Sequence, residues 1–304
     1  MITRDGFGPD SDQRSGQLAW RLAESLSDRV SSWKGLARFG RPVLDWFGKT
    51  VRPGPLKDVL SGTWQGHPAH PMLTDIPIGA WTSAFFLDVL GGEARHRAAD
   101  SLIGVGVLAA LPTAVTGLSE LTDSNQDQKV VVIGTAHAAG NLTAVALYSA
   151  AYVLRRRGAR KLGGLLSLAG AGMATASGFL GGHLSFRKGL GVDQTAFDAP
   201  VRRWTPVMDA SELPDGEARK VSVSGVDVLV FRRGDRILAL ANRCTHRGGP
   251  LHKGKVEGME VRCPWHHSTF SLEDGGIIQG PATAPQPVFE TRIENGKLEV
   301  RSKR

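Results

Sequence analysis

The fold of the C-terminal region is decided by Cys244-Thr-His246 and, sixteen residues later, Cys263-Pro-Trp-His266. Each motif holds one cysteine and one histidine, and the 304 residues contain no other cysteine. Two thiolates and two imidazoles in this order can hold a [2Fe–2S] cluster in which one iron takes both sulfurs and the other takes both nitrogens. We therefore predict Cys244, His246, Cys263 and His266 as iron ligands.

A structural zinc ion is the main alternative for two cysteines and two histidines. Zinc sites usually keep the two cysteines together and the two histidines together, whereas each motif here supplies one of each. The spacing therefore favours the cluster. Two other histidines, His252 and His267, fit no ligand spacing, and we expect both to be exposed and non-ligating.

Residues 242–251 and 263–270 closely resemble the two cluster-binding loops of the Rieske iron–sulfur family. The resemblance implies two loops that follow strands and meet around the cluster. It also gives Ser268 as a hydrogen-bond donor that tunes the cluster, while the tyrosine donor of the family is replaced by Phe270. His267 stands where the family usually has glycine, which predicts some strain in the second loop.

The loops are similar to those of the ferredoxin and oxygenase branch of the family. Its quinol-oxidising members have a further cysteine in each loop, and the corresponding residues here, Gly249 and Trp265, cannot form that disulfide. The missing disulfide and tyrosine imply a low to intermediate reduction potential. Alternating strands, with an Asn295-Gly296 turn signal, predict a small antiparallel β domain over 204–304.

Four apolar stretches lie earlier in the chain, at 73–90, 102–119, 130–154 and 162–181. Each is close to the roughly 20 residues that cross a bilayer core, and all are rich in the small residues that pack helices in lipid. Buried helices of a soluble bundle would be amphipathic rather than apolar all round. The prediction is an α + β multidomain protein of the bacterial cytoplasmic membrane: N-terminal region 1–54, four-helix transmembrane bundle 55–186, linker 187–203 and all-β Rieske domain.

The start of the first stretch reads His67-Pro-Ala-His70-Pro, followed by Met-Leu-Thr-Asp75. This His-Pro-x-His-Pro signature resembles an uncharacterised bacterial family of four-helix membrane domains, the domain of unknown function 2231. The resemblance covers about residues 55–185. It implies the four-span topology and brings no established activity.

Four histidines are expected to gather at one face of the membrane domain, on the side of the Rieske domain. His67 and His70 precede the first span, His137 lies about two turns inside the third, and His183 follows the fourth. Intramembrane histidines indicate a functional site by default. Haem b, a quinone or proton site, and helix capping are all open, with His137 and His183 as the preferred axial pair for haem.

Charge gives conflicting expectations for the side on which the Rieske domain lies. By the positive-inside rule, the basic loops 95–97 and 155–161 are expected in the cytoplasm. The Rieske domain would then lie on the external side. That topology exports a basic N-terminal region, as well as a domain whose cluster is normally inserted in the cytoplasm. Arg155-Arg-Arg157 is a poor match to a twin-arginine signal. The side stays open, with a slight preference for the external one.

Apolar residues of the N-terminal region recur at helical spacing, with Arg and Lys between them: Leu18, Leu22, Leu26, Val30, Trp33 and Leu36. They predict one or two amphipathic helices, either lying on lipid or packed on the membrane domain. The net charge of +8 has no nucleic-acid motif beside it, so membrane lipid is the expected partner, with no nucleic acid. We detect no internal repeat in the sequence.

The predicted function is one-electron transfer by a membrane-anchored Rieske protein that works with a redox partner protein or a quinone. We expect no complete oxygenase, because the sequence shows no substrate-oxidising iron domain beside the Rieske domain. Two alternatives stay open. The first is a subunit of a quinol or cytochrome oxidoreductase with haem or quinone in the membrane domain. The second is a redox or oxygen sensor without turnover.

Overall fold

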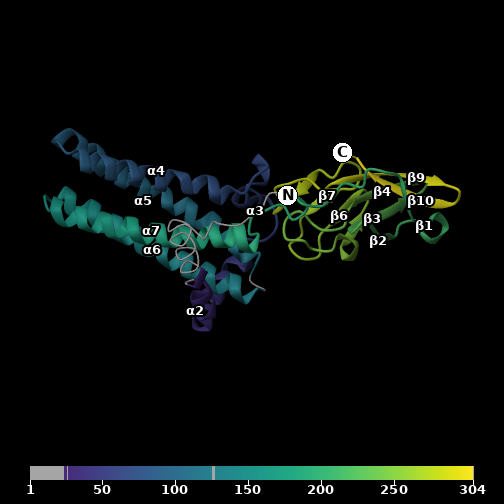
Figure 1. The fold of residues 1–304 in the computed structure, drawn as a ribbon, viewed down its shortest axis with the longest axis horizontal. Coiled ribbons are helices and arrows are strands. Elements are labelled where there is room, and N and C mark those ends of the chain that lie inside the picture. The colour runs from purple at the N-terminus through teal and green to yellow at the C-terminus, as the bar shows by residue number, and fades with distance from the viewer. Residues whose placement is uncertain (1–23, 26, 125–126, 304) are drawn as a thin grey trace, which may run out of the picture.

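The computed structural model describes residues 24–25, 27–124 and 127–303, and it shows a helical part and a β part at opposite ends of an elongated molecule (Figure 1). Leu18, Leu22 and Leu26 of the predicted N-terminal pattern lie outside the described residues. Later residues of the pattern lead into α2 (Lys34–Thr50), which crosses the helical part near its junction with the β part. Two short helices, α3 (Pro55–Ser61) and η1 (Thr63–Gln65), follow it.

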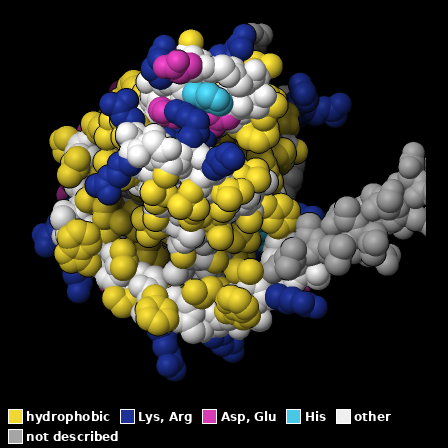
Figure 2. Space-filling view, turned by 90° about the vertical axis from the view of Figure 1, so that its left-hand side faces the viewer, with side chains coloured by type: hydrophobic (Ala, Val, Ile, Leu, Met, Phe, Trp, Pro, Cys, Tyr) yellow, Lys and Arg dark blue, Asp and Glu magenta, His cyan; other side chains and the backbone are white. Residues whose placement is uncertain are grey.

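Four long helices form the membrane domain, as predicted. They are α4 (Ala69–Leu90), α5 (Glu93–Thr122), α6 (Gln128–Arg156) and α7 (Arg160–Lys188), and each is long and apolar enough to cross a membrane. The view from the far end of this domain shows many hydrophobic side chains, with acidic side chains and a histidine mainly near the top and Lys and Arg side chains around the rim (Figure 2). Apolar side chains that cover the outside of a bundle are expected where lipid surrounds it.

The two helical hairpins, α4–α5 and α6–α7, repeat the same inner contacts. Three residues of α4 each contact a residue of α6, and in each pair the α6 residue comes 67 positions later in the chain. His70 and His137 have ring centroids 6.3 Å apart, Trp81 stacks on Tyr148 at 4.1 Å, and Asp88 pairs with Arg155. In each pair, the two residues occupy the same position in their respective hairpins. Such contacts between equivalent positions indicate a pseudo-two-fold axis between the hairpins.

The outer helices of the hairpins follow the same rule with an interval of 64 residues. The His70 ring lies against Thr113 and Gly117 of α5, while the His137 ring lies against Ser177 and Gly181 of α7. The membrane domain is therefore built from two equivalent hairpins. The repeat keeps the residue type at His70/His137 and Gly117/Gly181 but changes it at Trp81/Tyr148 and Asp88/Arg155, so it is too sparse to be recognised in the sequence.

A buried ion network closes the end of the bundle that is remote from the β part. Arg155 donates to Asp88 at 2.9 Å and to Asp100 at 3.1 Å, and Arg160 donates to Asp100 at 2.6 Å. His96 lies in the same group beside Asp88, at the end of the bundle opposite to the other four membrane-domain histidines. Because charge is balanced within the network, acidic side chains can lie at the end of a span.

The β part consists of two antiparallel sheets. The larger has the order β1-β10-β9-β4-β3-β2 and the smaller the order β5-β6-β7-β8. The larger sheet contains β1 (Thr205–Asp209), β2 (Ala218–Val223), β3 (Val226–Arg233), β4 (Arg236–Ala241), β9 (Val288–Glu294) and β10 (Lys297–Ser302). The smaller contains β5 (Lys255–Glu257), β6 (Glu260–Arg262), β7 (Thr269–Ser271) and β8 (Ile277–Gln279). Asn295 and Gly296 both have positive φ in the β9–β10 turn, which confirms the predicted hairpin.

Candidate redox site at the junction of the two domains

Two loops at the tip of the β domain carry the four predicted ligands. The first loop follows β4, and the second joins β6 to β7. Each is closed by the same backbone hydrogen bond: Cys244 N–H donates to the Gly249 carbonyl at 2.9 Å, and Cys263 N–H donates to the Ser268 carbonyl at 2.8 Å. These equivalent turns hold the two motifs face to face.

The four side chains converge with sulfur on one side and nitrogen on the other. Cys244 and Cys263 are both free thiols with 1% exposure, and the rings of His246 and His266 lie 5.0 Å apart at 90°. The Nδ1 atom of His246 is buried without a hydrogen-bond partner. Buried polar atoms are rarely left unpaired, so this nitrogen fits a metal ligand better than a purely structural role. The residues present therefore fit a [2Fe–2S] cluster.

The protonation states of this group suit ligation. Hydrogen bonding with Cys244 lowers the pKa of Cys263 to about 7, while the same contact and burial raise the pKa of Cys244. Burial, with the charge of His246, lowers the pKa of His266 to about 4. Imidazole binds metal in its neutral form and thiol as thiolate, so Cys263 and His266 are disposed toward their ligating forms.

Ser268 and the loop before β9 lie directly against the site. Ala282 N–H donates to Ser268 Oγ at 3.0 Å, and Ser268 is fully buried. The serine oxygen is thus already an acceptor, which leaves its hydroxyl proton available for donation toward the ligand group. Phe270 packs in the core beneath the two cysteines. Gly249 allows close packing, since an added Cβ would lie 2.6 Å from Cys263 Sγ.

The two histidines expected to be non-ligating have different surroundings. His267 is exposed with φ +64°, a conformation that favours glycine, in keeping with the strain predicted for the second loop. His252 is half-buried rather than exposed, which corrects the expectation. Both its backbone N–H and its ring Nδ1 lie 2.9 Å from Asn242 Oδ1, so this histidine braces the start of the first loop.

The imidazole of His246 faces the membrane domain. Its Nε2 lies 3.3 Å from Oδ2 of Asp123, which caps the C-terminal end of α5. Lys57 from α3 is 2.9 Å from the same carboxylate oxygen and donates to the Ser119 carbonyl at 2.7 Å. Burial alone would raise the pKa of Asp123, but the His246 hydrogen bond and the Lys57 charge bring it down to about 2. Asp123 is therefore a carboxylate at neutral pH.

Several hydrogen bonds between side chains and backbone groups hold the same junction together. Gly280 N–H donates to Asp58 at 3.0 Å, and Thr63 donates to the Ala282 carbonyl at 3.0 Å. On the other side, Arg247 donates to the Gly189 carbonyl at 3.0 Å. The tip of the β domain is thus seated on α3, η1 and the segment after α7.

A small cavity of about 30 Å³ lies within this junction. Its wall includes His246 and Arg247 from the first loop, together with Glu120, Asp123 and His70 from the membrane domain. A volume of this size holds one or two water molecules. The cavity therefore lies between the predicted iron ligand His246 and the membrane histidine His70.

The structure joins the membrane histidines in a different pair from the one preferred on sequence grounds. His137 meets His70 and not His183. The charged groups nearest His183 are Arg187, Lys188, Asp28 and Glu24, and the side chain of His67 is exposed. The sequence predicted at which end of α7 His183 lies, but it did not predict which face of the helix carries the side chain. His183 stands two residues after Gly181, about 200° around the helix from the face that touches His137.

The His70 and His137 rings are held in matching ways. Nδ1 of His70 lies 2.9 Å from the Thr113 carbonyl and Nδ1 of His137 lies 2.8 Å from the Ser177 carbonyl. A carbonyl can only accept, so both Nδ1 atoms carry hydrogen, and in the neutral rings both Nε2 atoms are unprotonated acceptors. The Nε2 of His137 is within 3.1 Å of the Asn141 amide nitrogen.

These features define a Rieske-type iron–sulfur domain docked on a four-helix membrane domain, and comparison with known families agrees. The profile of the Rieske [2Fe-2S] domain matches residues 203–290, and that of the predicted membrane protein family DUF2231 matches residues 66–194. The chain belongs to the Rieske [2Fe-2S] family through its C-terminal domain, which follows a DUF2231 membrane domain.

Similar proteins match the C-terminal domain. The ferredoxin CarAc of Metapseudomonas resinovorans is 33% identical over 98 residues, which are 32% of this chain and 92% of that ferredoxin. The ferredoxin component of the naphthalene 1,2-dioxygenase system of Pseudomonas aeruginosa is 26% identical over 33% of this chain and 96% of its own length. The ferredoxin in a solved complex with the oxygenase of carbazole 1,9a-dioxygenase has a TM-score of 0.31 and 32% identity, covering 32% of this chain and 92% of that ferredoxin chain.

Proposed function

We propose that this protein is a membrane-anchored Rieske electron carrier that passes single electrons between a soluble redox partner and its own membrane domain. The observation that carries the proposal is the contact between His246 Nε2 and Asp123 Oδ2, which are 3.3 Å apart. The membrane histidine His70 lines the adjoining cavity. An electron relay needs its centres close together, and this junction supplies that proximity.

In this proposal Cys244 and Cys263 bind one iron, and His246 and His266 bind the other. The cluster supplies reversible one-electron chemistry, at a potential set by its ligands, hydrogen bonds and solvent exposure. Ser268 donates toward the cluster, since its oxygen already accepts from Ala282. Burial of both cysteines keeps water from the sulfur side of the site.

The exposed approach to the cluster is on the His266 side, because the membrane domain covers His246. Trp265 is 54% exposed and its ring lies 6.4 Å from that of His266. A flat aromatic side chain beside a half-buried ligand is a suitable contact for a redox partner protein. The ferredoxins to which this domain is similar belong to dioxygenase systems, which supports a protein partner for this side.

A second candidate function is that of an oxidoreductase subunit with haem b or a quinone in the membrane domain. The observation that favours it is the pair His70 and His137, each with Nδ1 bound to a backbone carbonyl. This is the common state of metal-ligating histidines, which donate one ring N–H to a carbonyl and bind with the other nitrogen. In this candidate, His70 and His137 replace His137 and His183 as the ligand pair.

Electron paramagnetic resonance and visible spectroscopy of the detergent-purified full chain test both candidates. The electron carrier requires a rhombic signal from the reduced protein, with an average g value below that of the free electron. Haem would add a Soret band. Quinol-dependent appearance of the cluster signal would identify a quinone site, whereas reduction only by a ferredoxin reductase would support the protein partner.

A further inference from the structure

The helix α2 offers an interaction surface that electron transfer does not use. It crosses the bundle at the end next to the Rieske domain (Figure 1). Two of its glycines permit a close approach: an added Cβ at Gly40 would collide with Thr135 of α6, and one at Gly48 would lie 2.9 Å from Thr122 of α5. Because these contacts are at the end of one span and the start of the next, α2 lies at the level of a membrane boundary.

The side chains of α2 fall into three stripes. Buried residues pack against α5 and α6, exposed apolar residues form a second stripe, and basic residues form a third. The buried stripe is Ala37, Gly40, Leu44 and Phe47; the exposed apolar stripe is Phe39, Val43 and Trp46; the basic stripe contains Lys34, Arg38, Arg41 and Lys49, with Asp45 as its one acidic member. At 3.6 residues per turn, the apolar and basic stripes stand about 110° to either side of the buried stripe.

The apolar stripe is strongly exposed. Phe39 is 76% exposed and Trp46 is 63% exposed. The helix already packs on the bundle through its buried stripe, so this exposed apolar stripe indicates contact with a second apolar environment. The neighbouring helices α4–α7 also expose large hydrophobic side chains along their length.

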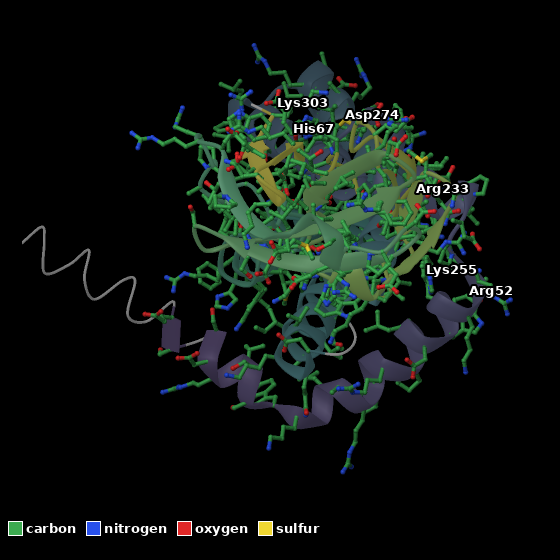
Figure 3. The ribbon with its side chains drawn as sticks, turned by 90° about the vertical axis from the view of Figure 1, so that its right-hand side faces the viewer. Arg52, His67, Arg233, Lys255, Asp274 and Lys303 are labelled. Atoms are coloured by element: carbon green, nitrogen blue, oxygen red, sulfur yellow. The ribbon has the colours of Figure 1, made fainter. Side chains whose placement is uncertain are left out.

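The direction of the two free stripes follows from the handedness of the helix. Figure 3 views the molecule from the Rieske end, and α2 passes below the bundle from left to right, toward Arg52. The buried stripe faces upward, toward the bundle. Because the helix is right-handed and runs from left to right, the stripe reached next by turning in the direction of the chain faces the viewer. The basic stripe therefore faces the Rieske side, and the apolar stripe faces the side of the spans.

We propose that α2 is an interfacial anchor that binds anionic phospholipid at the membrane surface on the Rieske side. Phe39, Val43 and Trp46 lie at the boundary of headgroups and acyl chains, where aromatic side chains are favoured. Lys34, Arg38 and Lys49 face the phosphates. Since α2 also packs on α5 and α6, lipid binding at α2 holds the junction below the cluster at a fixed height above the bilayer.

The test reconstitutes the full chain into bilayers of phosphatidylcholine and phosphatidylglycerol, with either lipid brominated to quench tryptophan. The fluorescence difference between the wild type and Trp46→Phe isolates the contribution of Trp46. We expect that contribution to be quenched by brominated lipid, and more strongly by brominated phosphatidylglycerol. A Trp46 contribution that neither lipid quenches would overturn the proposal.

The variant Lys34→Gln/Arg38→Gln/Lys49→Gln tests the charge. The preference for phosphatidylglycerol around Trp46 should fall about five-fold or more, since each basic residue near an anionic surface contributes measurably to binding. The matched control, Arg202→Gln/Arg203→Gln/Lys253→Gln, removes three exposed charges from the linker and the Rieske domain and should leave the preference unchanged. An unchanged preference in the α2 variant, or an equal loss in the control, contradicts the proposal.

Discussion

Nε2 of His246 and Oδ2 of Asp123 are 3.3 Å apart, although 123 residues separate them in the chain and they belong to different domains. This contact connects the predicted nitrogen side of the cluster to the last turn of a membrane span. An iron-bound imidazole has one ring nitrogen left, so its environment acts on the metal through that nitrogen. The position of Asp123 is therefore expected to influence the potential of the cluster and the seating of the Rieske domain.

Substitution of a proposed ligand should remove the cluster. His246→Ala and Cys263→Ser each take away half of the protein ligands of one iron, so the rhombic resonance signal and the bound iron should both be lost. His67→Ala is a suitable control, because the side chain of His67 is exposed and lies outside the ligand group. Retention of a full signal in His246→Ala would refute the ligand assignment.

Removal of the negative charge at position 123 should raise the reduction potential. The reduced cluster carries one more electron than the oxidised cluster, and a neighbouring carboxylate disfavours that extra charge. Asp123→Asn should therefore shift the potential upward by up to roughly 100 mV. A redox titration followed by electron paramagnetic resonance measures the shift, and Asp235→Asn, in an exposed turn, should show none. A downward shift in Asp123→Asn would contradict the assigned contact.

Lys57 is expected to secure the junction between the domains. It is 4% exposed, and its removal leaves the buried Asp123 carboxylate without its closest positive charge. Lys57→Met should destabilise the folded protein by about 3–5 kcal/mol, and Lys57→Met/Asp123→Leu should regain most of that loss. Thermal unfolding in detergent measures both. If the double variant is no more stable than the single variant, the unpaired charge is not the cause.

We expect a similar loss of stability when Arg155 is removed from the ion network at the remote end of the bundle. Arg155 bridges Asp88 and Asp100, whereas Arg156 is exposed. Arg155→Leu should lower stability by about 3–5 kcal/mol and Arg156→Leu by less than about 0.5 kcal/mol. Equal effects of the two substitutions on the unfolding temperature would contradict the network.

His267 should be replaceable by glycine with a gain in stability. Its φ of +64° costs a residue with a side chain on the order of 1 kcal/mol, which glycine avoids. His267→Gly should raise the free energy of unfolding by about that amount and leave the resonance signal unchanged. A loss of the signal would assign His267 a role at the cluster that its exposed position does not indicate.

The sequence predicted those features that follow from local pattern. The spacing of Cys244, His246, Cys263 and His266 identified the cluster loops, and the Asn295-Gly296 dipeptide identified a hairpin, because both depend on residues close in the chain. The four spans were also predicted, because the length of an apolar stretch is itself a physical requirement for crossing a bilayer. The helices extend beyond the apolar stretches with polar residues, which is why the predicted spans were shorter.

Features that depend on the rotation and pairing of helices were missed. The internal repeat preserves residue identity at His70 and His137, but it pairs Trp81 with Tyr148 and Asp88 with Arg155, where only position and complementarity are kept. The structure brings His137 to His70 rather than to His183, because a position along the membrane normal does not specify the face of a helix. Asp123 gave no signal, since a single acidic residue in a loop is ordinary until the docked domain is seen.

The most direct test of the central claim is metal and sulfide analysis of anaerobically purified full-length protein, combined with electron paramagnetic resonance of the reduced form. The account predicts equal amounts of iron and acid-labile sulfide and a rhombic signal with an average g value below that of the free electron. Stoichiometric zinc without iron and sulfide would contradict it.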